Sequence, residues 1–472
     1  MTTRAIRLLM LVLAFALVAA ACSSGDDSGD TTTTAAAAET TTTAAAAETT
    51  TTATAAETTT TAAAETTTTA GAGVACDEPV KVGVITDQTG ALAIYGAHIL
   101  RSFPFGMEYG TGAAGTGDTA SGQTFMLDGC EIEVIYGDDT SDAEVTATVA
   151  REFIEVEGVD ILVGSVSSGV TASIQQLALD NDVIHIAAPA AANDLTGIGF
   201  NPNSFRTSRN NYQDAVAICE YLPTQYSTFA QIAPDYAFGH GGAAAYRDAC
   251  TLNGGTFVID DIFAPFDTTD FTPYMEQILD SGAEAWMVTW AGGGFINMMD
   301  AAVAVGVTEE MDMGAPFVDN VALAPFFANA VGSTGSILYH YTQPDNPVND
   351  WLIEKTNALA TPVNPDLFDA DAFNAALLIT EALKVTGGDA SADALRDAME
   401  GISFEGPKGL IEIRAEDHVA IQDMYVVTLL NIDDANQEFF EAVKTVRPDV
   451  PCLLVDEYLD RCGDLPIGSL SG

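Results

Sequence analysis

Short apolar runs alternate with longer amphipathic segments along the chain from about residue 80. In the first part of this region, the apolar runs predict strands at 80–87, 132–136, 160–164 and 183–187. Large apolar residues at helical spacing predict helices at 95–109 and 142–156, and a further helix that ends at 179. Strands that alternate with helices predict right-handed β-α-β units and a parallel sheet.

The same pattern then restarts. After a helix at 212–222, apolar runs predict strands at 228–233, 256–263, 285–290 and 313–318, with helices between them. The last part of the chain predicts a strand at 335–341, helices at 348–358 and 368–386, a helix capped by Ser391, and a late pair of strands at 410–414 and 422–430. Two successive open sheets indicate an α/β protein with two doubly wound parallel-sheet lobes. Because such sheets bind ligands beyond the carboxyl ends of their strands, we expect a binding cleft between the lobes.

The N-terminus has the pattern of a secretion signal. Arg4 and Arg7 precede an apolar run at 8–18, which is short for a membrane span and is followed by the small residues 19–21. We therefore expect residues 1–21 to be a signal peptide. Cys22 directly after the small residues resembles a bacterial lipobox, so we expect lipidation there; ordinary signal cleavage is the alternative.

A repeat of threonine, alanine and glutamate fills residues 31–70, with no aromatic or large aliphatic residue. Such a segment cannot bury enough surface to offset the entropy of ordering, so we expect residues 22–75 to be a tether. The folded part is expected from about Cys76 onward, and no transmembrane helix is expected in it.

The chain is strongly acidic, with 67 acidic and 16 basic residues and a formal net charge of −51. It has no basic patch that could neutralise phosphates, which argues against nucleic-acid binding. Anionic lipid surfaces would repel the chain as well. The expected lipid anchor is therefore its predicted hold on the membrane.

Six cysteines remain besides Cys22, and an even number outside the cytoplasm indicates disulfides. Two of them precede predicted neighbouring strands, two lie on helices that flank the strand at 228–233, and two are close together near the end. The expected pairs are Cys76–Cys130, Cys219–Cys250 and Cys452–Cys462. A metal site is the alternative, but the sequence has no Cys-x-x-Cys or His-x-x-x-His spacing, so we expect neither a metal nor a cofactor.

Several motifs occur in a characteristic order: 83–90, 136–142, 158–170, Phe205-Arg-Thr207, 235–239, 267–271 and 404–409. With them, the chain from Val80 to about Leu430 resembles the type I periplasmic binding proteins, specifically the branched-chain amino-acid (leucine/isoleucine/valine) binding proteins. This resemblance implies two lobes joined by three crossover segments, a hinged cleft that closes on a small molecule, and delivery to the permease of an ABC importer. Lobe 1 would comprise 77–207 and about 336–409, lobe 2 would comprise 208–335 and about 410–435, and 436–472 would be a C-terminal tail.

The segment Gly164–Gly169 ends a predicted strand and opens a predicted helix. Unpaired backbone N–H groups and the helix dipole favour an anion there, and the hydroxyls of Ser167 and Ser168 add donors. The resemblance implies that Ser168 binds a ligand carboxylate. The alternative is that the two serines only cap the helix.

The resemblance also implies a set of pocket residues around this helix. They are Tyr95, Ala190, Ala192, Tyr236, Phe238 and Trp290. At the position where the family has a glutamate for the ligand's ammonium, this chain has Pro316, and Asp319 is the nearest carboxylate. Because a buried cation without a carboxylate is costly, an ordinary branched-chain amino acid is disfavoured, and we expect a small polar metabolite that is amino-acid-like, an amide or a carboxylate.

Two other functions are compatible with parts of the sequence. A ligand-sensing receptor domain would have the same fold. An envelope hydrolase is disfavoured, because neither Ser167 nor Ser168 lies in a Gly-x-Ser-x-Gly motif. The fingerprint-like run at 110–115 follows a helix and not a strand, which is the wrong context for a dinucleotide site. The expected function is therefore solute binding outside the cytoplasm, without catalysis.

Overall fold

The computed structural model describes residues 73–472, with the exception of 293, 315, 328 and 329. The expected signal peptide, Cys22 and almost all of the expected tether lie outside the described residues. The described part belongs to one compact unit, Thr68–Gly472. In this part, no helix combines the length and the apolar character that a membrane span requires.

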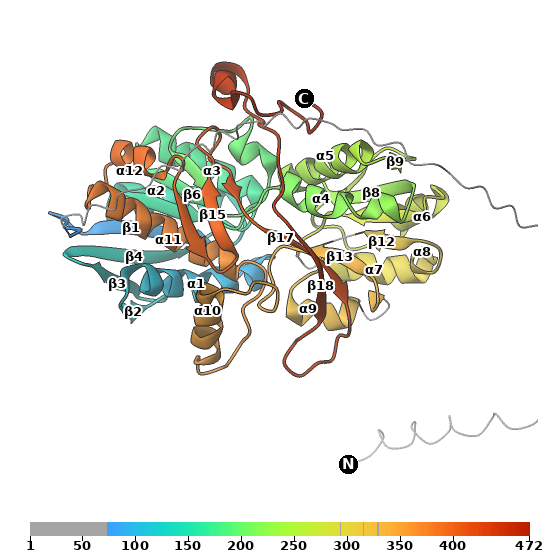
Figure 1. Ribbon diagram of the computed structural model, residues 1–472, viewed down its shortest axis with the longest axis horizontal. Coiled ribbons are helices and arrows are strands. Elements are labelled where there is room, and N and C mark those ends of the chain that lie inside the picture. The colour runs from blue at the N-terminus through green and yellow to red at the C-terminus, as the bar shows by residue number, and fades with distance from the viewer. Residues whose placement is uncertain (1–72, 293, 315, 328–329) are drawn as a thin grey trace, which may run out of the picture. The chain divides into compact units, whose positions relative to one another are not determined.

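The first lobe is built on a seven-stranded sheet with the order β2-β3-β4-β1-β5-β6-β7 (Figure 1). Strands β4, β1, β5, β6 and β7 are parallel, as the alternating pattern predicts. The strand bounds are β1 Val80–Thr86, β2 Thr116–Asp118, β3 Gly122–Leu127, β4 Cys130–Asp138, β5 Ile161–Gly164, β6 Ile184–Ala187 and β7 Ser204–Arg206. The antiparallel edge formed by β2 and β3 was not predicted. All three residues of β2 are exposed, so this strand leaves no apolar signal in the sequence.

Helices cover both faces of this sheet, and the alternation of side chains along the central strands explains how. Ile85 of β1 and Leu162 of β5 face one helical layer, whereas Val84 and Val163 face the other. The helices of the first lobe are α1 Ala93–Thr111, α2 Ala143–Glu152, α3 Ser168–Asp180, α11 Asp369–Thr386 and α12 Ala392–Met399. The carboxyl ends of β5 and β6 lead directly into the segments that form the candidate site.

The second lobe is built on a smaller sheet with the order β10-β8-β11-β12, in which β9 also pairs with β8. All of its pairings are parallel. The bounds are β8 Thr228–Pro234, β9 Thr256–Phe257, β10 Ile262–Ala264, β11 Ala285–Val288 and β12 Asp312–Gly314. The single strand expected at 256–263 is wrong, because two short strands replace it. The intervening Asp261 instead accepts hydrogen bonds from the side chains of Gln231 and Arg247.

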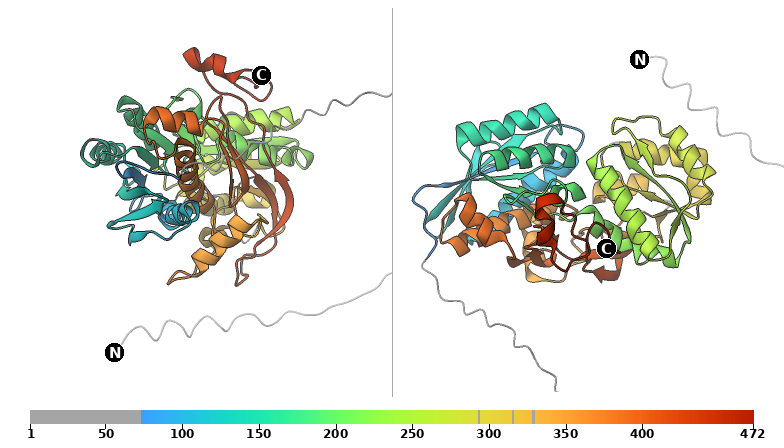
Figure 2. Two further views of the ribbon diagram at one scale, coloured as in Figure 1. Left: turned by 60° about the vertical axis from the view of Figure 1, so that its left-hand side comes forward. Right: turned by 90° about the horizontal axis from the view of Figure 1, so that it is seen from above.

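Helices again flank this sheet, so that each lobe is a layered α/β unit (Figure 2). Their bounds are α4 Asn211–Cys219, α5 Ala237–Leu252, α6 Thr272–Asp280, α7 Gly294–Val305, α8 Val307–Glu310 and α9 Asn320–Phe326. Helix α6 begins at Thr272 with a proline in its first turn, as expected from the sequence. Helix α4 packs against α5, and this pair supplies polar residues to the site described below.

Two small antiparallel sheets form from the last part of the chain. One has the order β13-β17-β18 and the other β14-β15-β16. Their bounds are β13 Thr334–Ile337, β14 Ser403–Gly406, β15 Gly409–Ile413, β16 Ala420–Ile421, β17 Met424–Leu429 and β18 Phe440–Val446, and α10 spans Pro347–Asn357. The two late strands expected at 410–414 and 422–430 are present as β15 and β17, and they lie in different sheets: β15 pairs with β14 and β16, whereas β17 pairs with β13 and β18.

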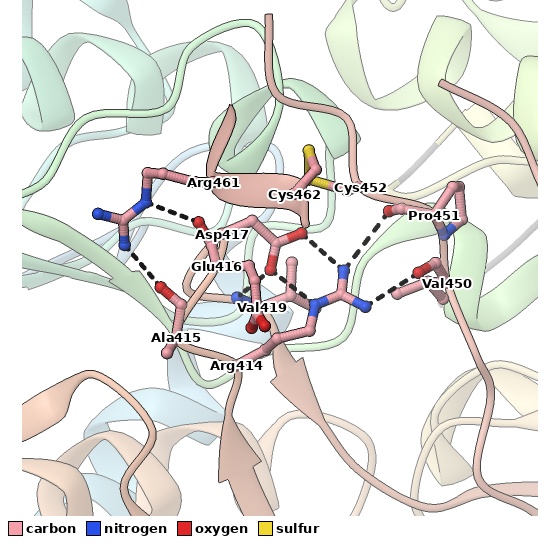
Figure 3. Close-up of a disulfide and its surroundings, with 10 residues drawn as sticks. All are labelled: Arg414, Ala415, Glu416, Asp417, Val419, Val450, Pro451, Cys452, Arg461 and Cys462. Carbon is pink, nitrogen blue, oxygen red and sulfur yellow. Dashed lines mark hydrogen bonds and ion pairs between the residues drawn. A yellow bond between two sulfur atoms is a disulfide. The ribbon is translucent and has the colours of Figure 1, made fainter. Parts of the chain in front are cut away.

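The three expected disulfides are present, Cys76–Cys130, Cys219–Cys250 and Cys452–Cys462. The last one closes a loop in the expected C-terminal tail, and two arginines near it make hydrogen bonds to the neighbouring backbone and side chains (Figure 3). Arg414 bonds the carboxylate of Asp417 and the carbonyl oxygen of Val450, at 2.8 and 3.0 Å. Arg461 donates to the carbonyl oxygens of Ala415 and Glu416. The expected tail is thus joined to the folded part by strand pairing through β18 and by these arginine contacts.

Candidate functional site

Two adjoining cavities lie where the segments after β5 and β6 meet residues of the second lobe. We name them after one residue of each, the Ser168 cavity and the Asp214 cavity. Their cavity volumes are about 30 and about 70 Å³, and the values rise to about 340 and about 640 Å³ when all space between the lining atoms and the open solvent at the mouths is counted. Their common wall consists of Tyr95, Arg209, Phe238, Ala291 and Phe368. Because they share this wall, we treat them as two ends of one site.

The walls of this site are mainly apolar and rich in aromatic rings. Tyr95 meets Phe368 edge to face with ring centroids 5.1 Å apart, and Tyr236 lies 6.0 Å from Phe238. Burial raises the pKa of both Tyr95 and Tyr236 above the ordinary value, so both phenols are neutral at physiological pH. Such walls favour a ligand with an apolar body, because its burial removes apolar surface from water.

Ser168 is held in one orientation at the N-terminus of α3. Its Oγ accepts hydrogen bonds from the backbone N–H groups of Ala191 and Ala192, at 3.3 and 3.1 Å. These bonds occupy the lone pairs of the oxygen and leave its hydroxyl proton to donate. Within the described residues the structure gives that proton no acceptor, and Ser168 lines the cavity. The hydroxyl and the helix N-terminus together favour an anionic group at this end.

Arg209 lines both cavities, and it is the one basic residue among their described lining residues. Its Nε donates to Asp214 at 3.2 Å, and its Nη1 donates to the carbonyl oxygen of Pro189 at 3.1 Å. Its guanidinium also lies 5.3 Å from the centre of the Phe368 ring. These contacts fix the guanidinium plane while Nη2 stays available for a ligand. Arg209 was not expected in the site from the sequence, although a second arginine just after Phe205-Arg-Thr207 is conspicuous in a chain with few basic residues.

The far end of the Asp214 cavity is polar. Asn211, Asp214 and Tyr246 line it, and each is at most 6% exposed. Burial raises the pKa of Asp214, while the charge of Arg209 opposes that shift. None of these three residues was expected in the site. The polar run that begins at Asn210 has the pattern of a helix start, which accounts for Asn211 and Asp214, and Tyr246 lies inside a helix.

Five of the expected site residues line the two cavities. They are Tyr95, Ser168, Tyr236, Phe238 and Trp290. Four others do not. Ser167 precedes α3 and makes no capping bond with its side chain. Asp319 caps α9, where its Oδ1 accepts the N–H groups of Val321 and Ala322.

Ala190 and Ala192 are also absent from the cavity walls, and their carbonyl oxygens accept hydrogen bonds from the buried Arg206. Ala191 between them lines the Ser168 cavity. Further wall residues that the sequence did not reveal are Leu92, Val166, Pro189, Ala291 and Phe368. Across the described residues, no group of three or more His, Cys, Asp or Glu side chains is placed to hold a metal ion.

Comparisons with known proteins agree with this architecture. The sequence model of the family described as "Periplasmic binding protein" matches residues 79–435. A Leu/Ile/Val-binding protein homolog 6 of Brucella melitensis is 26% identical over 371 residues, which cover 77% of this chain and 90% of the relative.

Solved structures give the same result. An ABC-type branched-chain amino acid transporter protein from Rhodopseudomonas palustris CGA009 is 30% identical, with a TM-score of 0.68, over 80% of this chain and 100% of that one. A solute-binding protein of an ABC transporter from Rhodopseudomonas palustris BisB5, in complex with 3,4-dihydroxybenzoic acid, is 23% identical, with a TM-score of 0.67, over 78% of this chain and 97% of that one. With a family match across most of its folded part and two α/β lobes around a shared cavity, this chain belongs to the periplasmic binding protein family.

Proposed function

We propose that this protein is an extracytoplasmic solute-binding protein that captures a small carboxylate with an apolar, ring-sized body and delivers it to an ABC importer. The observation that carries the proposal is the make-up of the Ser168 cavity. It combines aromatic walls with one oriented hydroxyl, one arginine and a helix N-terminus. A carboxylate satisfies these donors, and its apolar body fills the space between the aromatic rings.

Charge balance separates this ligand class from the branched-chain amino acids. Asp214 lines the site, but Arg209 lies against it and offsets its charge. An ammonium group would therefore find no unpaired carboxylate among the described wall residues, whereas a carboxylate would still find the Ser168 hydroxyl and the N-terminus of α3. Oδ1 of Asp319 accepts two backbone N–H groups at the start of α9, and Asp319 lines neither cavity. A net anionic ligand therefore suits the site better than a zwitterion.

The mechanism follows from the placement of the site between the lobes. A ligand that touches Ser168 of the first lobe and Phe238 of the second makes all its contacts only when the lobes are together. It therefore shifts the population toward the closed form. The closed form would be recognised by the permease of the importer. Support for this partner comes from the relatives, whose names describe ABC transporter proteins.

Membrane attachment through Cys22 is part of the proposal. The small residues directly before Cys22 and the polar tether after it support a lipid anchor that keeps the protein near its permease. Replacement Cys22→Ser in the full-length protein should release it from the membrane fraction into the soluble fraction. Retention of the variant in the membrane fraction would contradict the lipid anchor.

The ligand class is tested by titration calorimetry and thermal shift on the purified full-length protein. The panel contains benzoate, phenylacetate, cyclohexanecarboxylate, leucine, valine and the neutral amides of the acids. The acids should raise the melting temperature, since a ligand that binds only the folded form stabilises it by mass action. The amides should bind more weakly. Binding of leucine and valine without binding of the acids would refute the ligand class.

A further inference from the structure

The Asp214 cavity ends in a cluster of three buried polar side chains that the capture of a simple apolar carboxylate does not require. Asn211 and Asp214 lie three residues apart on α4 and therefore on the same face of the helix, and Tyr246 lies on the neighbouring α5. Their exposed fractions are 2%, 6% and 2%. All three line the same cavity, together with the aromatic rings of Trp290 and Phe317.

Two of these side chains lack the partners that buried polar groups normally have. The Oδ1 atom of Asn211 and the hydroxyl of Tyr246 are buried and make no hydrogen bond to any described residue. Oδ1 of the Asp214 carboxylate accepts a hydrogen bond from Nε of Arg209. Buried polar groups without partners are rare because they lose their hydration without compensation. Their convergence on one cavity therefore indicates that a ligand group completes their hydrogen bonds.

We propose that Asn211, Asp214 and Tyr246 form a second subsite, which binds a hydroxyl group carried at the end of the ligand away from its carboxylate. The inference rests on the proposed function, since it takes the carboxylate to be bound at Ser168. It adds that the preferred ligand is a hydroxy acid with an apolar body.

The chemistry of the subsite selects a neutral group that both donates and accepts. A ligand hydroxyl can donate to Asp214 or Asn211 and accept from the Tyr246 hydroxyl. Burial keeps the phenol of Tyr246 neutral, because it raises the pKa of that group well above the ordinary value, and the charge of Asp214 raises it further. A second carboxylate on the ligand would be repelled by Asp214. An ammonium group would be opposed by Arg209.

The experiment compares matched pairs of acids that differ only in the distal hydroxyl. Two lengths are used, benzoate against 4-hydroxybenzoate, and 3-phenylpropanoate against 3-(4-hydroxyphenyl)propanoate. Affinities are measured by calorimetry on the full-length protein and on Tyr246→Phe, which removes one oxygen and preserves the ring. Thermal unfolding without ligand reports whether the variant is folded. Asn211→Leu, which is close in size and removes the amide oxygen, is the second variant, because losing this acceptor should also weaken hydroxyl binding.

The hydroxylated acid of at least one pair should bind roughly three- to tenfold more tightly than its partner, the range expected for one net hydrogen bond. Tyr246→Phe should remove most of that gain, so that the two acids of the pair bind with nearly equal affinity. If both acids of each pair bind equally, or if the gain survives in both variants, the subsite is refuted while the carboxylate function stands. If none of the four acids binds, the proposed function fails and the inference fails with it.

Discussion

The substitution Ser168→Ala separates the structural role of this serine from its role in ligand binding. Its Oγ accepts two buried N–H groups, from Ala191 and Ala192, at 3.3 and 3.1 Å. Both alanines are at most 3% exposed, so water cannot replace the lost acceptor without rearrangement. The free energy of unfolding without ligand should therefore fall by about 1–3 kcal/mol. Urea denaturation followed by circular dichroism measures this change.

The effect on binding is separate, because it concerns the hydroxyl proton and not the lone pairs. A hydrogen bond to a carboxylate contributes about 1–3 kcal/mol, so affinity for the carboxylate should fall roughly 5- to 150-fold. Calorimetry well below the melting temperature of the variant measures the affinity of the folded protein alone. The expected change is in affinity for the acids, with little change for their amides.

Ser167→Ala is the matched control, since Ser167 adjoins Ser168 but makes no capping bond with its side chain and lines neither cavity. It should change neither stability nor affinity. If Ser168→Ala lowers stability but changes affinity less than about twofold, Ser168 supports the loop and does not hold the ligand. If Ser167→Ala weakens binding as much as Ser168→Ala, the assignment of the anion to the Ser168 hydroxyl is refuted.

Three further predictions concern charge, disulfides and pH. Arg209→Met should weaken carboxylate binding by about tenfold or more. Arg209→Lys should restore only part of the loss, because lysine keeps the charge but not the planar contacts with Asp214 and Pro189. If calorimetry gives both variants the same affinity as the unchanged protein, the role of Arg209 is refuted. The disulfides close loops with sequence separations of 54, 31 and 10 residues. Chain entropy therefore predicts that replacing Cys76–Cys130 by serines lowers the free energy of unfolding by about 4 kcal/mol, and that replacing Cys452–Cys462 lowers it by about 3 kcal/mol. Urea denaturation measures both changes, and the reverse order would contradict this account. Hydrogen bonds from His418 and Arg461 lower the pKa of Glu400 from 4.5 to about 2. The contribution of Glu400 to stability is therefore complete above pH 4.5 and is lost as the pH falls toward 2. Glu400→Gln should make the melting temperature depend less on pH across that window, and an unchanged pH dependence would contradict the assigned pKa shift.

The periodicity of apolar residues determined the architecture wherever a strand is buried. Strands β1, β5 and β6 consist almost wholly of buried residues, so each leaves an apolar run in the sequence. Strand β2 is wholly exposed, and β3 begins with three half-buried residues, so the hairpin of β2 and β3 leaves no long apolar run and was missed. Strand β18 was missed for the same reason, since five of its seven residues are exposed. The disulfide pairs were also predictable, because they depend on which strands and helices are neighbours in the fold.

One part of the site could be predicted from the sequence, and the other part could not. The N-terminus of a helix after a strand is a local feature, so the sequence by itself pointed to Ser168. The polar end of the cavity depends on tertiary packing. Asn210 and Gln213 form a capping box, which explains the polar run at the start of α4 without any ligand. Only the packing of α4 against α5 decided that Asn211 and Asp214 face a cavity beside Tyr246, because the direction in which a helix presents its polar side chains is set by the element that packs against it.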